Sequence, residues 1–79
     1  MRRFVYTVEL HEAVWEVGGI IVQKQYWFTN YEDAFTRYNT LLENERNTGK
    51  IVVLNEIIYH LINEGKKVHE YSIFSTLVA

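Results

Sequence analysis

Two histidines near the C-terminus, His60 and His69, are the residues whose spacing best suits them to act together. Between them, Glu64 and Gly65 are typical of a hairpin turn, and a symmetric loop at these two residues would set His60 directly opposite His69. Two imidazoles at that separation could bind a metal ion or titrate together as a pH switch. A third ligand is missing, because His11 lies in a different hairpin and the chain has no cysteine. The simpler interpretation is a pair of sheet-surface histidines, and we assign no metal and no cofactor.

Acidic residues form the second set that could do chemistry. Glu9, Glu12 and Glu16 could supply paired carboxylates for acid and base catalysis. Their spacing along an irregular strand would point the three side chains in different directions toward water rather than toward one another. This favours a solvated acidic edge. With Glu56 they could instead meet a basic groove on a partner, and would then speed association more than they strengthen binding. The sequence contains neither a nucleophile elbow nor a glycine-rich phosphate loop, so we expect a protein that is not an enzyme.

Length and composition predict one α+β domain over residues 1–79. Hydrophobic residues make up 48% of the chain and charged residues 23%, which excludes disorder. The formal charge is -2 and the basic residues are scattered, so binding to nucleic acid is not the expected function. The first residues resemble neither a secretory signal nor a membrane span, and the lack of cysteine fits a reducing compartment; we therefore expect a cytoplasmic protein without a membrane partner.

The first third of the chain predicts a β-hairpin. Residues 3–10 alternate apolar and polar side chains, and Gly18 and Gly19 favour a tight turn before a second strand over residues 20–28. The apolar positions change from even to odd numbers along the first strand. A β-bulge near His11 and Glu12 would correct this change. The inner face would then include eight residues of the hairpin: Val8, Leu10, Trp15, Val17, Ile20, Val22, Tyr26 and Phe28.

The middle of the chain predicts one amphipathic helix. Thr29 and Glu32 match a capping box, and apolar residues follow at steps of three and four. Residues 47–49, Asn-Thr-Gly, should end the helix. We expect Phe35 and Tyr38 to lie in the core, between this helix and its sheet.

The last third is ambiguous between strand and helix. The apolar pattern over residues 51–62 would suit an amphipathic helix, but half of these residues are Ile or Val, which favour a strand. We prefer a second hairpin. The resulting order is ββαββ, a four-stranded antiparallel sheet with one helix on one face, and the alternative order is ββααβ.

One helix can cover only one face of such a sheet, and the uncovered face would carry a large apolar surface. Surfaces of this kind usually contact another protein. The sequence therefore predicts a non-catalytic protein-binding module, a homodimer in the first instance, which acts as an inhibitor or accessory subunit, for example a phage-encoded one. Two alternatives remain: a single-stranded nucleic-acid binder with exposed sheet aromatics, and a small metal-binding or enzymatic protein that uses the two histidines. The predicted interface residues are Val5, Val14, Ile21, Trp27, Leu54 and Ile58.

Overall fold

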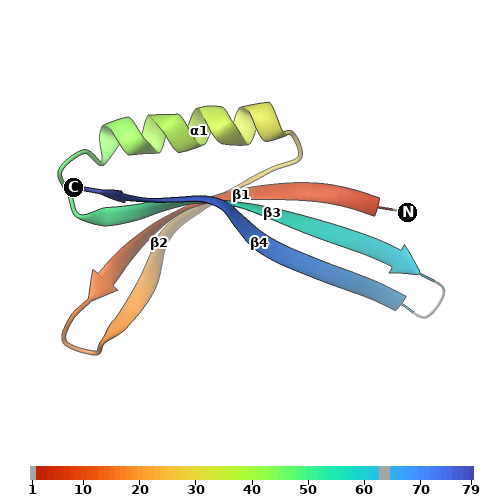
Figure 1. Ribbon diagram of the computed structural model, residues 1–79, viewed down its shortest axis with the longest axis horizontal. Coiled ribbons are helices and arrows are strands. Elements are labelled where there is room, and N and C mark those ends of the chain that lie inside the picture. The colour runs from red at the N-terminus through yellow and green to blue at the C-terminus, as the bar shows by residue number, and fades with distance from the viewer. Residues whose placement is uncertain (1, 63–64) are drawn as a thin grey trace.

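The chain folds into one antiparallel sheet with a single helix across it (Figure 1). The computed structural model describes residues 2–62 and 65–79. The elements are strand β1 (Arg2–Val14), strand β2 (Gly19–Phe28), helix α1 (Tyr31–Asn44), strand β3 (Lys50–Ile62) and strand β4 (Gly65–Val78). Their spatial order in the sheet is β2-β1-β3-β4, and every neighbouring pair is antiparallel. The predicted α+β fold and the ββαββ order are confirmed, and residues 51–62 are strand.

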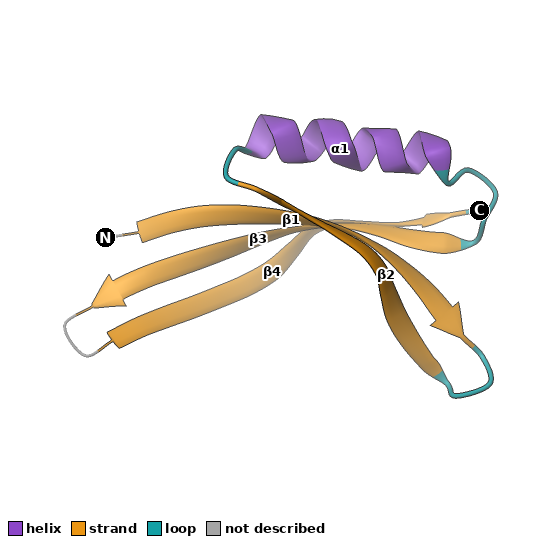
Figure 2. Cartoon of the chain, turned by 180° about the vertical axis from the view of Figure 1, so that it is seen from behind, coloured by secondary structure: helices purple, strands orange, loops and turns teal. Residues whose placement is uncertain are grey.

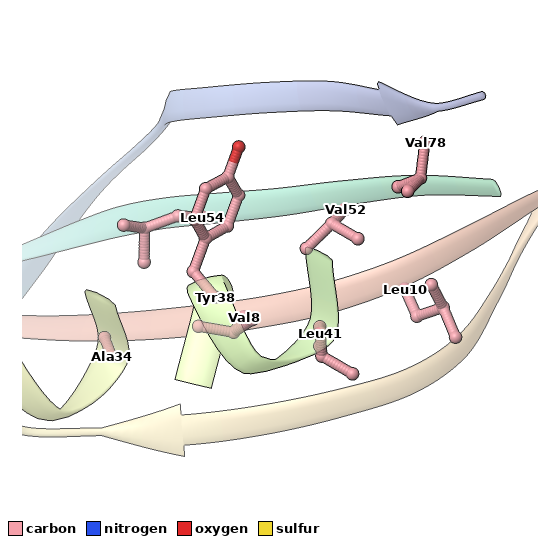
Figure 3. Packing of buried hydrophobic residues seen from close by; sticks show 8 residues of the cluster. All are labelled: Val8, Leu10, Ala34, Tyr38, Leu41, Val52, Leu54 and Val78. Carbon is pink, nitrogen blue, oxygen red and sulfur yellow. The ribbon is translucent and has the colours of Figure 1, made fainter. Parts of the chain in front are cut away.

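The core lies between helix α1 and the two central strands, β1 and β3. Side chains at alternate positions of these strands point to the helix. Helix residues spaced three and four apart pack against them. Figure 3 shows the eight buried residues of this cluster: Val8, Leu10, Ala34, Tyr38, Leu41, Val52, Leu54 and Val78. The prediction that Tyr38 is core is confirmed, with 5% of its surface exposed. Phe35 lies at the border of the cluster instead, 38% exposed and in ring contact with Phe74 at 6.0 Å.

Helix α1 begins one residue later than the sequence predicted. Asn30, not Thr29, is the N-cap: its side-chain oxygen accepts from the backbone N–H of Glu32 at 2.8 Å and of Asp33 at 3.2 Å. Asparagine caps helices at least as well as threonine, so the two neighbours compete for the position. The choice of Asn30 places Tyr31 in the first turn, where its ring meets Tyr6 edge-on at 5.7 Å.

A β-bulge interrupts the first hairpin where it was predicted, but on the opposite strand. The pairing changes between Leu10 and His11, which face Lys24 and Val22 respectively, so the extra residue is Gln23 of β2. A second register shift lies between Leu54 and Asn55 and leaves the extra residue in β4. Both extra residues thus belong to the two outer strands of the sheet.

The end of the β1–β2 hairpin is not part of the core, contrary to the prediction. Trp15 is 90% exposed and Val17 76%, while Ile20 and Val22 each keep more than half of their surface exposed. The reason is geometric: a helix of 14 residues is about 21 Å long, and the hairpin extends past its end. Nearer the helix, Tyr26 and Phe28 do pack against the core, as predicted.

Strong twisting gives the molecule an open shape. The two hairpins diverge from the centre of the sheet, and both bend away from the helix (Figures 1 and 2). The molecule measures 46 × 31 × 15 Å and its radius of gyration is 14.4 Å. A compact chain of this length would have a radius of gyration of about 12 Å. The chain therefore exposes more surface than its size requires.

Candidate functional site

The sheet face opposite helix α1 carries a polar cluster with very little exposure. Strand alternation puts Thr7 and Glu9 of β1 on this face, with Asn55 of β3 paired to Thr7. Thr7 is completely buried, and Glu9 and Asn55 each expose 6% of their surface. Helix α1 lies on the other face of the sheet, and both hairpins bend toward the face that carries these residues (Figure 2).

Hydrogen bonds join this cluster across all four strands. From β4, the Ser72 hydroxyl donates to the Asn55 amide oxygen at 2.9 Å, and the Asn55 amide nitrogen donates to the Thr7 hydroxyl at 3.2 Å. Thr7 in turn donates to Glu9 Oε2 at 3.2 Å. The Gln25 amide of β2 donates to the same carboxylate oxygen at 2.8 Å. Among the residues that the structure describes, no buried side-chain nitrogen or oxygen lacks a partner. We call these residues, together with His11, the polar network.

Glu9 is the centre of the polar network. Loss of hydration raises the pKa of its carboxyl group, but hydrogen bonds from His11, Gln25 and Thr7 outweigh that effect and lower the pKa below its ordinary value. The His11 bond is the shortest of the three, 2.7 Å between Nε2 and Oε1. Glu9 is therefore ionised at neutral pH and acts as an acceptor that holds three neighbouring side chains. A carboxylate of this kind does not serve as a general acid near pH 7.

Apolar side chains flank the polar network on both sides. Register places Val5, Ile57 and the exposed Glu70 in one row beyond one side, with Val68 further along β4, and Leu77 and Val22 beyond the other. Of these, Leu77 is 63% exposed, and Val22 and Val68 are about half exposed. The Trp27 ring stands beside the network, 55% exposed, with its indole nitrogen donating to Gln25 at 3.2 Å. The uncovered face thus has a polar centre between apolar ends.

The predicted interface residues divide between the two faces of the sheet. Val5 and Trp27 lie on the uncovered face, as expected. Leu54 is completely buried under the helix, so its expected place on the uncovered face is wrong. Strand alternation puts three others on the helix side of the sheet, where the sheet extends past the helix: Val14, Ile21 and Ile58. The prediction placed the bulge in β1, which would have turned Val14 to the uncovered face. The bulge lies in β2 instead, so β1 alternates without interruption and Val14 stays on the helix side.

The four acidic residues do not form one edge. Glu9 is buried in the polar network, so the expectation that it faces water is wrong. Glu12 accepts from the Gln23 amide on the helix side, and Glu16 lies in the hairpin turn. Glu56 accepts from the Tyr71 hydroxyl, also on the helix side. The structure disperses these carboxylates over three surfaces.

The two histidines meet, although not in the predicted register. Ile62 pairs with Gly65, so His60 faces Lys67, and His69 faces Ile58. The offset is two residues from the predicted pairing, whose turn included Glu64, a residue outside the described part of the chain. The two rings are diagonal neighbours instead, with centroids 5.7 Å apart and planes at 82°. Within residues 2–62 and 65–79 there is no group of three side chains able to hold a metal ion.

Sequence reasoning missed the polar network because its members are distant in the chain. Thr7 and Asn55 are 48 residues apart, and only the β1–β3 register makes them neighbours. The available signal was weak: a threonine and a glutamate at alternate positions of an apolar strand, with one asparagine in the later apolar run.

The chain matches no protein-family model, no curated protein and no solved structure. In the part of the chain that the structure describes, the one helix is too short and too polar to span a bilayer.

Proposed function

We propose that this chain is a non-catalytic protein-binding module that forms a homodimer through the sheet face opposite helix α1. The observation that supports this most is the exposed apolar surface of that face, with Leu77 and Val68 at its two ends and Trp27 beside the polar network. Exposed clusters of this kind are typical of protein contacts, and tryptophan is among the residues that contribute most to binding.

Surface area supports a second copy as the partner. The chain exposes 5586 Å², whereas a compact monomer of 9.4 kDa exposes about 5,000 Å². The excess approaches the area of about 800 Å² that each partner contributes to a standard interface. In a twofold dimer both subunits use the same face, so one exposed face per chain is enough to form the interface.

The polar network would give such a dimer its orientation. Its outer groups, Ser72 and Gln25, lie between the apolar ends, so the apolar parts of two faces meet only when the polar parts also align. Mismatched alignments would bury polar groups without partners, which costs about 1–3 kcal/mol per group. A dimer of this kind would act by occupying a site on a larger protein, as an inhibitor or an accessory subunit.

The test is a comparison of mass in solution between two charge variants. Size exclusion with light scattering should give about twice 9.4 kDa for the unmodified chain. Leu77→Lys puts a charge on the uncovered face and should shift the population to monomer. Asn39→Lys adds the same charge on the exposed side of helix α1 and should leave the dimer intact. A monomer of the unmodified chain at high micromolar concentration, or equal effects of both variants, would contradict the proposal.

A further inference from the structure

Helix α1 leaves part of its own side of the sheet uncovered. The helix begins over Tyr6, and the N-terminal half of β1 extends past it together with the ends of β3 and β4 (Figure 1). We call this surface the basic ledge. Register places eight described residues on it: Arg2, Phe4, Glu56, Ile58, His60, Lys67, His69 and Tyr71.

Positive charge is concentrated at the outer end of the basic ledge. Arg2, His60 and Lys67 form one row across β1, β3 and β4, and the His69 ring packs diagonally against His60. Within the described chain, Glu56 is the carboxylate on this part of the face, and it is already engaged by the Tyr71 hydroxyl. Glu56 lies four residues from His60, about 13 Å along the strand. The sequence shows these basic residues as scattered, and the fold brings them together.

Aromatic rings lie directly inward of this charge. Phe4 of β1 is 41% exposed, and Tyr71 of β4 is 49% exposed. Half-exposed rings on a sheet are stacking platforms for unpaired bases, and nearby cations contact the phosphates that link those bases. Neither feature alone identifies a ligand, but a ligand with flat rings and regularly spaced phosphates would use both.

We propose that the basic ledge binds single-stranded nucleic acid, with bases stacked on Phe4 and Tyr71 and phosphates on the row formed by Arg2, His60 and Lys67. The contact needs no base-specific hydrogen bonds and therefore has low sequence preference. It is separate from the proposed dimer surface, which lies on the opposite face of the sheet.

Histidine protonation makes this binding depend on pH. Loss of hydration, then the positive charges of Arg2, His69 and Lys67, lower the pKa of His60 below its ordinary value. A bound phosphate removes that repulsion and favours the protonated ring. Binding should therefore tighten as the pH falls, through the gain of charge on His60 that Arg2 and Lys67 oppose in the free protein.

Fluorescence anisotropy of a labelled oligothymidylate of about ten nucleotides tests the proposal. Where His60 is uncharged, Arg2 and Lys67 are the two cations of the row, and the logarithm of the binding constant should fall against the logarithm of salt concentration with a slope of about -1.4. With His60 charged, the slope should steepen to about -2.1. Absence of binding at low salt and mildly acidic pH would overturn the proposal.

Two pairs of variants separate the charge from the rings. Lys67→Gln should reduce the slope by about 0.7, whereas Lys24→Gln, on the other outer strand, should leave it unchanged. Phe4→Leu should weaken oligonucleotide binding about fivefold or more, whereas Trp15→Leu, at the distant hairpin turn, should have no effect. All four positions are exposed, and thermal melting of each variant verifies folding.

Inorganic polyphosphate serves as the competing ligand because it has phosphates without bases. The proposal expects weaker binding of polyphosphate and no effect of Phe4→Leu on it. Equal affinity for both ligands, or insensitivity of oligonucleotide binding to Phe4→Leu, would show a general anion site and overturn the assignment to nucleic acid.

Discussion

The two faces of the central strands exclude water by opposite means. On the helix side, Val8 and Leu54 are fully buried by apolar packing against helix α1 (Figure 3). On the other side, Thr7 and Glu9 are the neighbours of Val8 in β1. They are buried almost as completely, although no helix covers them. The same two strands thus carry an apolar core on one face and a hydrogen-bonded polar network on the other.

This difference shows that low exposure does not by itself identify a hydrophobic core. The helix side is stabilised by apolar area removed from water, which any well-packed apolar residue could supply. The uncovered side depends on particular donors and acceptors, since each unpaired group there would cost free energy. The apolar side should tolerate similar residues, and the polar side should not.

The largest expected effect is on the helix side. Leu54→Ala should lower the free energy of unfolding by about 2–5 kcal/mol, because it removes buried methyl groups and leaves a cavity. Ile20→Ala, on the uncovered side of the hairpin end and 61% exposed, is the matched control and should change it by about 0.5 kcal/mol or less. Urea unfolding measures both. Similar effects of the two variants would remove the distinction between the faces.

Glu9→Gln tests the polar face with little change in shape. The substitution removes the negative charge that attracts three donors, and the new amide donor conflicts with Thr7 and Gln25 unless it turns toward His11, whose ring must then change tautomer to accept. We expect a loss of about 1–3 kcal/mol in unfolding free energy. Glu16→Gln, in the exposed turn, is the control and should have no measurable effect. A neutral Glu9→Gln would mean that the polar network contributes nothing to folding.

Acid pH sharpens the same comparison. The pKa of Glu9 is lower in the folded chain than its ordinary value, so the folded state binds fewer protons than the unfolded state. Its contribution to stability is complete above the unfolded pKa of about 4.3 and is lost as the pH falls through the folded pKa. The gap in urea midpoint between the unmodified chain and Glu9→Gln should therefore narrow below a pH of about 4. A gap that stays constant with pH would assign the effect of the variant to packing.

Tyr38→Phe probes a polar contact at the border of the apolar core. Its hydroxyl group pairs with that of Thr76 on β4, between the helix and the sheet. Removing it should cost about 0.5–1.5 kcal/mol, less than Glu9→Gln, because the partner is a single neutral hydroxyl. Tyr31→Phe, in the exposed first turn, is the control. Thermal melting should rank Tyr38→Phe between Leu54→Ala and Tyr31→Phe.

The smallest expected effect is at the largest exposed ring. Trp15→Ser should alter the unfolding free energy by about 0.5 kcal/mol or less, since the ring is 90% exposed beyond the helix. Chemical denaturation of the monomeric Leu77→Lys variant with and without this change measures it free of any dimer. A loss comparable to that of Leu54→Ala would show that the hairpin end packs against the core in solution.

Local periodicity predicted the first hairpin and the apolar face of the helix, including Tyr38. The periodicity of residues 51–62 suited a helix, and it was their branched side chains that predicted the strand. The polar network and the basic ledge did not follow, because each depends on registers between segments far apart in the chain. The exposure of Trp15 was missed because strand alternation does not indicate where a covering helix ends.

The β-bulges in the two outer strands have a consequence for how this chain behaves at high concentration. Gln23 interrupts β2 and the residue after Ser72 interrupts β4, so neither border of the sheet offers a long, regular row of unpaired backbone groups. A strand from another molecule could extend such a border for only a few residues before its hydrogen bonds lose alignment. The bulges therefore work against the growth of fibrils through edge-to-edge pairing of strands.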